Sequence, residues 1–249
     1  MIIRLLSFFI FTTSLFIPQH ISGQDMTQRD YYNWFDTQTG IENTGLFNGV
    51  RYKELYRIKN GKHKFYERPD FFVSQLVYDG QPYYDVNLKY DLYEDQMIAE
   101  IQAESGSSIL KLIKDLVESF RIEEKTFVHL KGTEVYKSKE QIDGFYEILK
   151  EGQSLFLYKK HSKIINKVLD NSAILYEFRS DNKYYVFHND LFYPVSNKND
   201  LIKIFPERKK QINEFYSGNK YLMKTNYDLF MIQIAERIDA ALTSKSSQS

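Results

Sequence analysis

The chain has 249 residues, and its 33 Lys and Arg balance 33 Asp and Glu, so the formal net charge is zero. This neutrality argues against a nucleic-acid-binding protein, which needs a basic face. No residue is Cys, so disulfides, zinc–thiolate sites and thiol catalysis are excluded, and the packed core alone must hold the fold.

The first 23 residues have the pattern of a secretory signal peptide. One positive charge, Arg4, precedes an apolar run over residues 5–17, and Pro18 separates this run from small and polar residues. The layout predicts cleavage after Gly23, with Gln24 as the new N-terminus. The run of about 13 residues is shorter than the roughly 20 that cross a bilayer. We therefore expect export, with no transmembrane segment in the mature chain.

Residues 24–44 are polar, apart from the aromatic cluster "YYNWF" at residues 31–35. Neither a helical nor a strand period persists there, so this segment is predicted to be a flexible leader whose aromatic side chains contact the body of the protein. From residue 45 to 196 the apolar pattern predicts an antiparallel β domain. The 20 Tyr and 19 Phe support this assignment, because flat rings pack well across a pleated sheet.

The clearest strand signal lies between residues 72 and 101. Two alternating runs flank Asp79-Gly80, a pair that accepts positive φ at both central positions of a tight hairpin turn. The second run predicts a half-buried strand, and Glu94-Asp95-Gln96 supplies the next turn. The inner face of this strand is predicted to carry Tyr84, Val86, Leu88, Tyr90 and Leu92. Its outer row is predicted to carry Tyr83, Asp85, Asn87, Lys89, Asp91 and Tyr93.

Strand and hairpin patterns continue beyond residue 101. Residues 107–120 fit an amphipathic helix as well as a strand followed by a turn, and the helix is the favoured prediction. Residues 126–130 are typical of a short strand. Turns are predicted at Glu151-Gly152, Asp181-Asn182 and Asn189-Asp190, each between alternating runs that pair as hairpins.

The period changes at Asn197, and residues 197–243 are predicted to form a C-terminal helical segment packed on the sheet. Asn197 or Asn199 is the expected N-cap, Pro206 suits a first helical turn, and Ser217-Gly218 suits a helix end. A last helix is expected from about residue 227 to 242, before a disordered tail at 244–249. The predicted fold class is mainly β (α+β). It is an antiparallel meander, sandwich or partly open barrel of about eight strands with two or three C-terminal helices.

The acids between residues 76 and 101 raise the question of a metal or sugar site. A calcium loop needs several oxygens that converge from one tight loop. Asp85, Asn87 and Asp91 instead lie along a straight strand at about 6.6 Å per two residues, so no metal site is predicted. Two acids on adjacent strands, such as Asp85 and Glu100, suit a glycosidase pair, although nothing in the sequence selects them.

Other catalytic patterns are absent from the sequence. The four histidines beyond residue 23 lie far apart and show no zinc-binding spacing: His63, His129, His161 and His188. There is also no G-x-S-x-G elbow, no P-loop and no dinucleotide fingerprint. Neither a catalytic residue nor a cofactor is therefore predicted. The outer row of residues 83–93 is the place where we expect a ligand, if this stretch binds one.

The pattern N-G-x-x-Y, followed by Y-D-G-x-x-Y-x-x-V-x-L-x-Y-D, resembles that of a family of exported, largely uncharacterised Bacteroidota proteins. The matching residues are Asn48, Gly49, Tyr52, Tyr78, Asp79, Gly80, Tyr83 or Tyr84, Val86, Leu88, Tyr90 and Asp91. The resemblance extends over roughly residues 45–238. Of the G-H-P-F-like segment typical of the family, only Gly61 and His63 are kept. The resemblance implies export in a bacterium with an outer membrane and a sheet followed by a helical tail, and it implies no catalytic residues.

These patterns predict a non-catalytic, exported binding or accessory protein of the bacterial cell envelope, located in the periplasm, at the outer membrane or outside the cell. The expected partner is an outer-membrane or periplasmic protein that docks on aromatic sheet surface or on an open edge. Nucleic acid is not expected as a partner. Two alternatives stay open: a hydrolase of envelope glycan or peptide that uses paired carboxylates, and a small-ligand-binding β-barrel.

Overall fold

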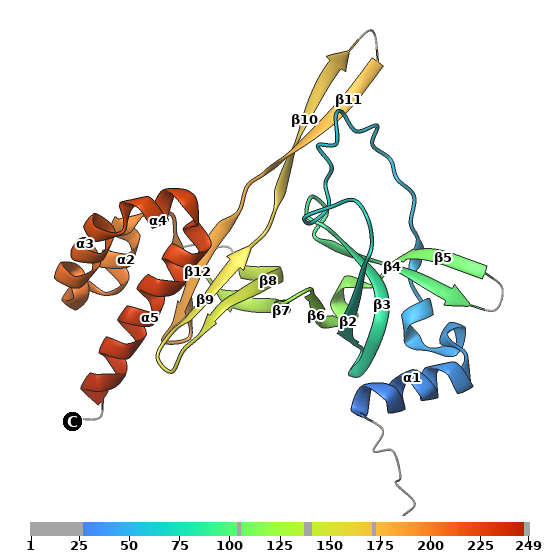
Figure 1. Cartoon of the computed structure of the whole chain (residues 1–249), viewed down its shortest axis with the longest axis horizontal. Coiled ribbons are helices and arrows are strands. Elements are labelled where there is room, and N and C mark those ends of the chain that lie inside the picture. The colour runs from blue at the N-terminus through green and yellow to red at the C-terminus, as the bar shows by residue number, and fades with distance from the viewer. Residues whose placement is uncertain (1–26, 104–105, 137–140, 171–172, 247–249) are drawn as a thin grey trace, which may run out of the picture.

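The computed structural model describes residues 27–103, 106–136, 141–170 and 173–246, and the predicted signal peptide lies outside them (Figure 1). Over these residues the chain forms 13 strands and five α-helices. The strands are β1 (Val50–Arg51), β2 (Phe72–Tyr78), β3 (Gln81–Asp91), β4 (Gln96–Ala103), β5 (Gly106–Lys111), β6 (Val117–Ile122), β7 (Lys125–Glu134), β8 (Gln141–Glu151), β9 (Phe156–Lys160), β10 (Lys163–Asp170), β11 (Ala173–Ser180), β12 (Lys183–His188) and β13 (Leu191–Val195). The helices are α1 (Gln28–Thr39), α2 (Lys198–Ile204), α3 (Lys209–Gly218), α4 (Lys220–Thr225) and α5 (Tyr227–Ser246).

Eleven strands form one antiparallel sheet in the order β1-β5-β4-β3-β2-β6-β7-β8-β9-β12-β13, and β10 pairs only with β11. Strands β2 to β5 form one meander and β6 to β9 another, joined by the β2–β6 pair. The first and last strands of the sheet do not pair with each other, so the sheet is open. The predicted mainly β fold with C-terminal helices is confirmed. The strands are more numerous than the predicted eight or so. The alternative of a small-ligand-binding barrel would require a closed sheet, and this sheet is open.

Three predicted turns join paired strands: Asp79-Gly80, Glu94-Asp95-Gln96, whose last residue already begins β4, and Asn189-Asp190. Both central residues have positive φ at Asp79-Gly80 (52° and 74°) and at Asn189-Asp190 (49° and 61°). Such angles match the twist of tight hairpins. The predicted turn at Glu151-Gly152 likewise joins β8 to β9. These predictions are confirmed. The positions of the turns depend on the backbone preferences of the turn residues themselves, which can be read from the sequence.

The prediction of a hairpin around Asp181-Asn182 is wrong. The preceding strand, β11, pairs with β10, whereas the following strand, β12, pairs with β9 of the large sheet. The β10–β11 pair is thus an insertion that projects from the sheet as a two-stranded arm (Figure 1). Backbone hydrogen bonds join residues 57–62 to Tyr176 and Phe178 of β11 and support the arm.

Residues 107–120 form strands rather than the favoured helix. Ser107 and Ser108 lie within β5, which pairs with β4. A 3-10 turn at Lys114–Leu116 then leads into β6, which pairs with β2. Val117 and Phe120 of β6 are buried in the core. The local sequence is compatible with a helix and with strands. Strands form because β5 pairs with the edge of β4 and β6 pairs with the edge of β2, and the local pattern does not reveal this pairing.

A helix, α1, occupies most of the segment predicted to be a leader without regular structure. Thr27 caps it: the Thr27 hydroxyl accepts the Asp30 backbone N–H, and the Asp30 carboxylate accepts the Thr27 backbone N–H. This reciprocal pair is a capping box. No residue of α1 is buried, and Tyr31, Trp34 and Phe35 are about half exposed. The helix therefore lies on the surface of the protein rather than in its core.

Four helices, α2 to α5, follow the sheet, compared with the predicted two or three. Asn197 caps α2 through a capping box with Asp200, as predicted. Helix α5 extends to Ser246, into the segment predicted to be a disordered tail. Over the described ranges, no helix combines the length and the apolar character that a membrane crossing requires.

Two large cores explain the aromatic composition. The first lies on strands β2 to β8 and contains the rings of Tyr90, Phe120, Phe127 and Phe145, whose centroids are 4.7–5.8 Å apart. The second lies between β9, β12 and β13 and the C-terminal helices, and Phe230 is fully buried in it. Most of these rings serve packing, so aromatic content by itself does not mark a binding surface.

Candidate ligand-binding cleft

The predicted outer row of β3 is divided between the core and the surface. Ser74 and Leu76 of β2 pair with Val86 and Tyr83 of β3, respectively. One residue separates the pair on β2, whereas two residues, Tyr84 and Asp85, separate the pair on β3. This β-bulge, where Asp85 has a φ of 57°, interrupts the alternation that the prediction assumed. Tyr83 therefore lies inside the core, only 5% exposed, which corrects its predicted place in the outer row.

The end of the row also departs from the prediction. Asp91 is fully buried and pairs with the Lys64 ammonium at 2.8 Å. Lys89 lies over the rings of Phe65 and Phe71, at 4.6 and 4.3 Å from their centroids. Tyr93 is partly exposed and packs near Phe178 of the arm. These three residues do not face a common cavity with the first part of the row.

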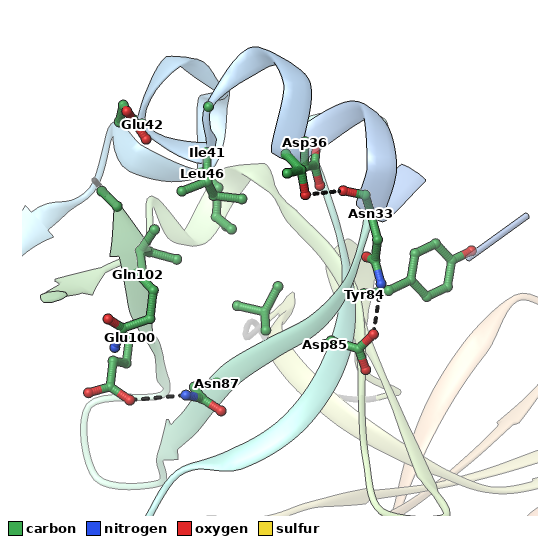
Figure 2. Close-up of a pocket in the computed structure, with 15 residues that line it drawn as sticks. Asn33, Asp36, Ile41, Glu42, Leu46, Tyr84, Asp85, Asn87, Glu100 and Gln102 are labelled. Atoms are coloured by element: carbon green, nitrogen blue, oxygen red, sulfur yellow. Dashed lines mark hydrogen bonds between the residues drawn. The ribbon is translucent and has the colours of Figure 1, made fainter. Parts of the chain in front are cut away.

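Asp85 and Asn87 do face a cavity. It is an open cleft of about 550 Å³ between α1, the turn that follows α1, and strands β3 and β4 (Figure 2). Glu100, which the sequence offered as a partner for Asp85, lines the same cleft. The lining residues are Asn33, Asp36, Thr37, Gly40, Ile41, Glu42, Leu46, Tyr84, Asp85, Val86, Asn87, Glu100, Ile101, Gln102 and Ala103.

Helix α1 forms one wall and is fastened through Asp85. The Arg29 guanidinium forms an ion pair with the Asp85 carboxylate, and the Asn33 amide donates to the same carboxylate at 2.8 Å. Arg29, Asn33 and Asp36 follow one face of the helix, since they are separated by four and three residues. Tyr32 adds a ring contact to Tyr84, with centroids 6.1 Å apart.

Strands β3 and β4 form the opposite wall. Asn87 and Glu100 are direct cross-strand partners, and the Asn87 amide donates to the Glu100 carboxylate at 3.0 Å. The Ser107 hydroxyl donates to the other oxygen of Glu100 at 3.2 Å. These bonds fix the orientation of both side chains, so the polar atoms along this wall are held in place before a ligand arrives.

The two aspartates of the cleft have different electrostatic environments. Burial raises the pKa of Asp36. The hydrogen bond from Arg29 lowers the pKa of Asp85, with Asn33 acting in the same direction. Asp85 is thus the more strongly ionised group, and Asp36 is the group that takes up a proton more readily.

The cleft combines an apolar floor with a polar rim. Ile41, Leu46, Val86 and Ile101 supply the aliphatic surface, and no Lys or Arg occurs among the described residues that line the cleft. The rim consists of carboxylate and amide side chains. No group of three or more His, Asp or Glu with the geometry of a metal site is found over the described residues. The arrangement suits a neutral, hydrogen-bonding ligand with an apolar face.

Sequence reasoning missed the contribution of α1, which supplies Asn33 and Asp36. The signal was present, because Thr27 and Asp30 have the spacing of a capping box and polar residues recur along one helical face. Comparisons with protein-family models, with curated proteins and with solved structures find no match to this chain.

Proposed function

We propose that the chain is a non-catalytic, exported binding protein of the bacterial cell envelope, and that the cleft beside α1 binds a polyhydroxylated ligand such as a stretch of glycan. The composition of the cleft carries the proposal: planar carboxylate and amide groups surround an aliphatic floor. Each such group presents two polar atoms that match neighbouring hydroxyls, and the floor suits the C–H face of a sugar ring. The volume of about 550 Å³ lies in the range of small-ligand sites.

The envelope location in this proposal comes from the N-terminal sequence. The charged residue, the short apolar run and the following small residues support export. An accessory role beside an outer-membrane or periplasmic protein is compatible with the rings of Tyr31, Trp34 and Phe35, which α1 exposes next to the cleft.

A glycan array tests the proposal. The chain from residue 24 onward would be compared with Asn87→Leu and Gln102→Leu, which replace cleft amides with apolar groups of similar size. We expect the wild type to be retained on a defined subset of glycans and both variants to lose most of that signal. Asn166→Leu, at an exposed position on the arm, is the matched control. Equal retention of all four proteins, or retention of none, would contradict the proposal.

A second candidate is the hydrolase with paired carboxylates. The opposite pKa shifts of Asp36 and Asp85 in one cleft favour this candidate. A glycosidase needs one protonated carboxylic acid and one ionised carboxylate, and it obtains them by shifting the two pKa values in opposite directions. The two candidates differ in whether the bound glycan is cleaved. If the cleft is hydrolytic, incubation with array-selected glycans releases new reducing ends, and Asp36→Asn abolishes this release while it keeps binding. Retention of glycans without release supports the binding protein.

A further inference from the structure

A second cavity, of about 260 Å³, lies where the β10–β11 arm leaves the sheet. It draws residues from the segment before β2, from β7, from the end of β9, from both strands of the arm and from α5. Three lysines line it: Lys125, Lys159 and Lys163. Only two carboxylates, Glu67 and Asp228, belong to the same lining, so the ammonium groups outnumber the carboxylates.

The three lysines differ in how closely a carboxylate approaches them. Asp228 binds Lys159 with both oxygens, at 2.8 and 2.7 Å, so these two charges neutralise each other. Glu67 is 3.8 Å from the Lys125 ammonium and is largely exposed, which makes this pair weak. Glu147, which is outside the lining, pairs with the lining residue His161, whose Nε2 lies 2.5 Å from the Glu147 carboxylate.

Lys163 differs from the other two lysines because no carboxylate is in close contact with its ammonium. Its ammonium donates to the carbonyls of His63 and Phe65, at 2.7 and 2.8 Å. Over the described part of the chain no carboxylate lies within 4.0 Å of it, and Lys163 is partly buried. Burial lowers the pKa of Lys163 by more than the carboxylates of Glu67 and Asp91, which lie further away, raise it. An ammonium withdrawn from water without an anion is costly, and the two carbonyls leave its third N–H available.

His63 gives an independent indication at the same cavity. Its Nδ1 is buried and has no hydrogen-bond partner over the described residues. Buried polar atoms are nearly always satisfied, so an unpartnered one beside an ammonium with no close carboxylate supports a ligand at this position.

We propose that this cavity binds an oxyanion, a phosphate or sulfate group, with Lys163 and Lys125 as its charged ligands. A cavity of about 260 Å³ holds such a group and leaves room for the small molecule that carries it. Ammonium groups bind these oxyanions through charge-assisted hydrogen bonds. Because the ligands come from the arm and from β7, the bound anion fastens the arm to the sheet.

Calorimetric titration of the whole chain with inorganic phosphate, and separately with sulfate, tests the proposal at constant ionic strength set by sodium chloride. We expect saturable binding with one ion per chain. Lys163→Met removes the charge and keeps the aliphatic stem, so its affinity is expected to fall by at least about tenfold. Lys125→Met, which removes the second charged ligand, is expected to weaken binding as well. It provides a second test in case Lys163→Met does not fold.

Lys167→Met is the matched control. Lys167 lies four residues further along β10, so it is on the same face of the strand, and it is exposed and outside the cavity. Its affinity should equal that of the wild type. A titration with glucose 6-phosphate distinguishes a free ion from the terminal group of a larger ligand, which would bind more tightly than phosphate. No saturable binding to the wild type, or the same affinity in Lys163→Met, Lys125→Met and Lys167→Met, would overturn the proposal.

Discussion

The Lys64 ammonium and the Asp91 carboxylate lie 2.8 Å apart, and each side chain is only 1% exposed. Asp91 also accepts the backbone N–H groups of Tyr93 and Glu94, both at 3.0 Å. The Lys64 ammonium lies 5.0 Å from the centroid of the Tyr56 ring. This buried pair fastens the segment before β2 to the end of β3, and it makes Asp91 a structural residue rather than a ligand for a bound molecule.

Loss of Lys64 should destabilise the protein strongly. Lys64→Met leaves the Asp91 charge buried without its partner, and breaking a buried pair in this way costs about 3–5 kcal/mol. Urea unfolding would measure the loss. Adding Asp91→Asn should recover part of it, because the amide carries no charge and still accepts a backbone N–H. Lys203→Met removes an exposed member of a surface pair and should change stability little. Equal effects of Lys64→Met and Lys203→Met would contradict the prediction.

A side chain at Gly144 should destabilise the protein. Its φ is +113°, and a Cβ there would overlap the Asp95 carboxylate and lie 2.5 Å from the Lys160 Nζ. Gly144→Ala should therefore strain the backbone and separate the Asp95–Lys160 pair, with a cost of about 3 kcal/mol or more in urea unfolding. Gly132 also has a positive φ, +71°, but has open space around it. Gly132→Ala should cost only the backbone strain, about 1–2 kcal/mol. Equal costs would show that the clash at Gly144 is relieved without loss of the pair.

Asp95 should make the stability depend on acid pH. Burial acts to raise the pKa of Asp95, but Lys160 at 2.6 Å, Tyr90 at 2.6 Å and Lys114 at 2.9 Å outweigh it and hold the pKa below its ordinary value of 3.8. A carboxylate whose pKa is lower in the folded state than in the unfolded state stabilises the fold at pH values above its unfolded-state pKa. This stabilisation is lost as the pH falls through the folded-state pKa. Urea unfolding should show wild type and Asp95→Asn furthest apart near about pH 6 and converging below about pH 3. A constant difference would contradict this.

Asp85 should control the docking of α1. No residue of the helix is buried, so the bonds from Arg29 and Asn33 to Asp85, together with the Tyr32–Tyr84 ring contact, attach it to the sheet. Asp85→Ala should speed amide hydrogen exchange throughout α1, whereas the urea midpoint of the whole protein should hardly move, because the core is untouched. Asp190→Ala, at a turn in the other half of the sheet, is the control. Unchanged exchange in α1 would show that other contacts hold the helix.

Local chemistry made much of the sheet predictable. Asp79-Gly80 and Asn189-Asp190 mark tight turns because their conformations are rare elsewhere, and Asn197 begins a helix because its side chain caps one. The β-bulge at Tyr84 and Asp85 could not be read in the same way. It depends on how β3 is registered against β2, and a shift of one residue exchanges the two faces of a strand.

The candidate cleft was predictable in part. Asp85 and Asn87 belong to the predicted outer row, and Glu100 was one possible partner for Asp85 that nothing in the sequence selected. All three line one cavity. Tyr83 and Asp91 were assigned to the same row, but the bulge and the Lys64 pair bury them. The wall from α1 was not predicted, because a helix with no buried residue lacks the apolar stripe on which helix prediction depends.

The most direct test of the cleft is an amide chemical-shift titration of the labelled chain, with soluble peptidoglycan fragments and with the glycans retained on the array. We expect concentration-dependent shifts that cluster in α1, in the bulge at Tyr84 and Asp85, and in β4 around Glu100. The same titration of Asn87→Leu should show little change. Shifts that cluster elsewhere in the molecule, or the absence of shifts with every glycan, would contradict the cleft as the ligand site.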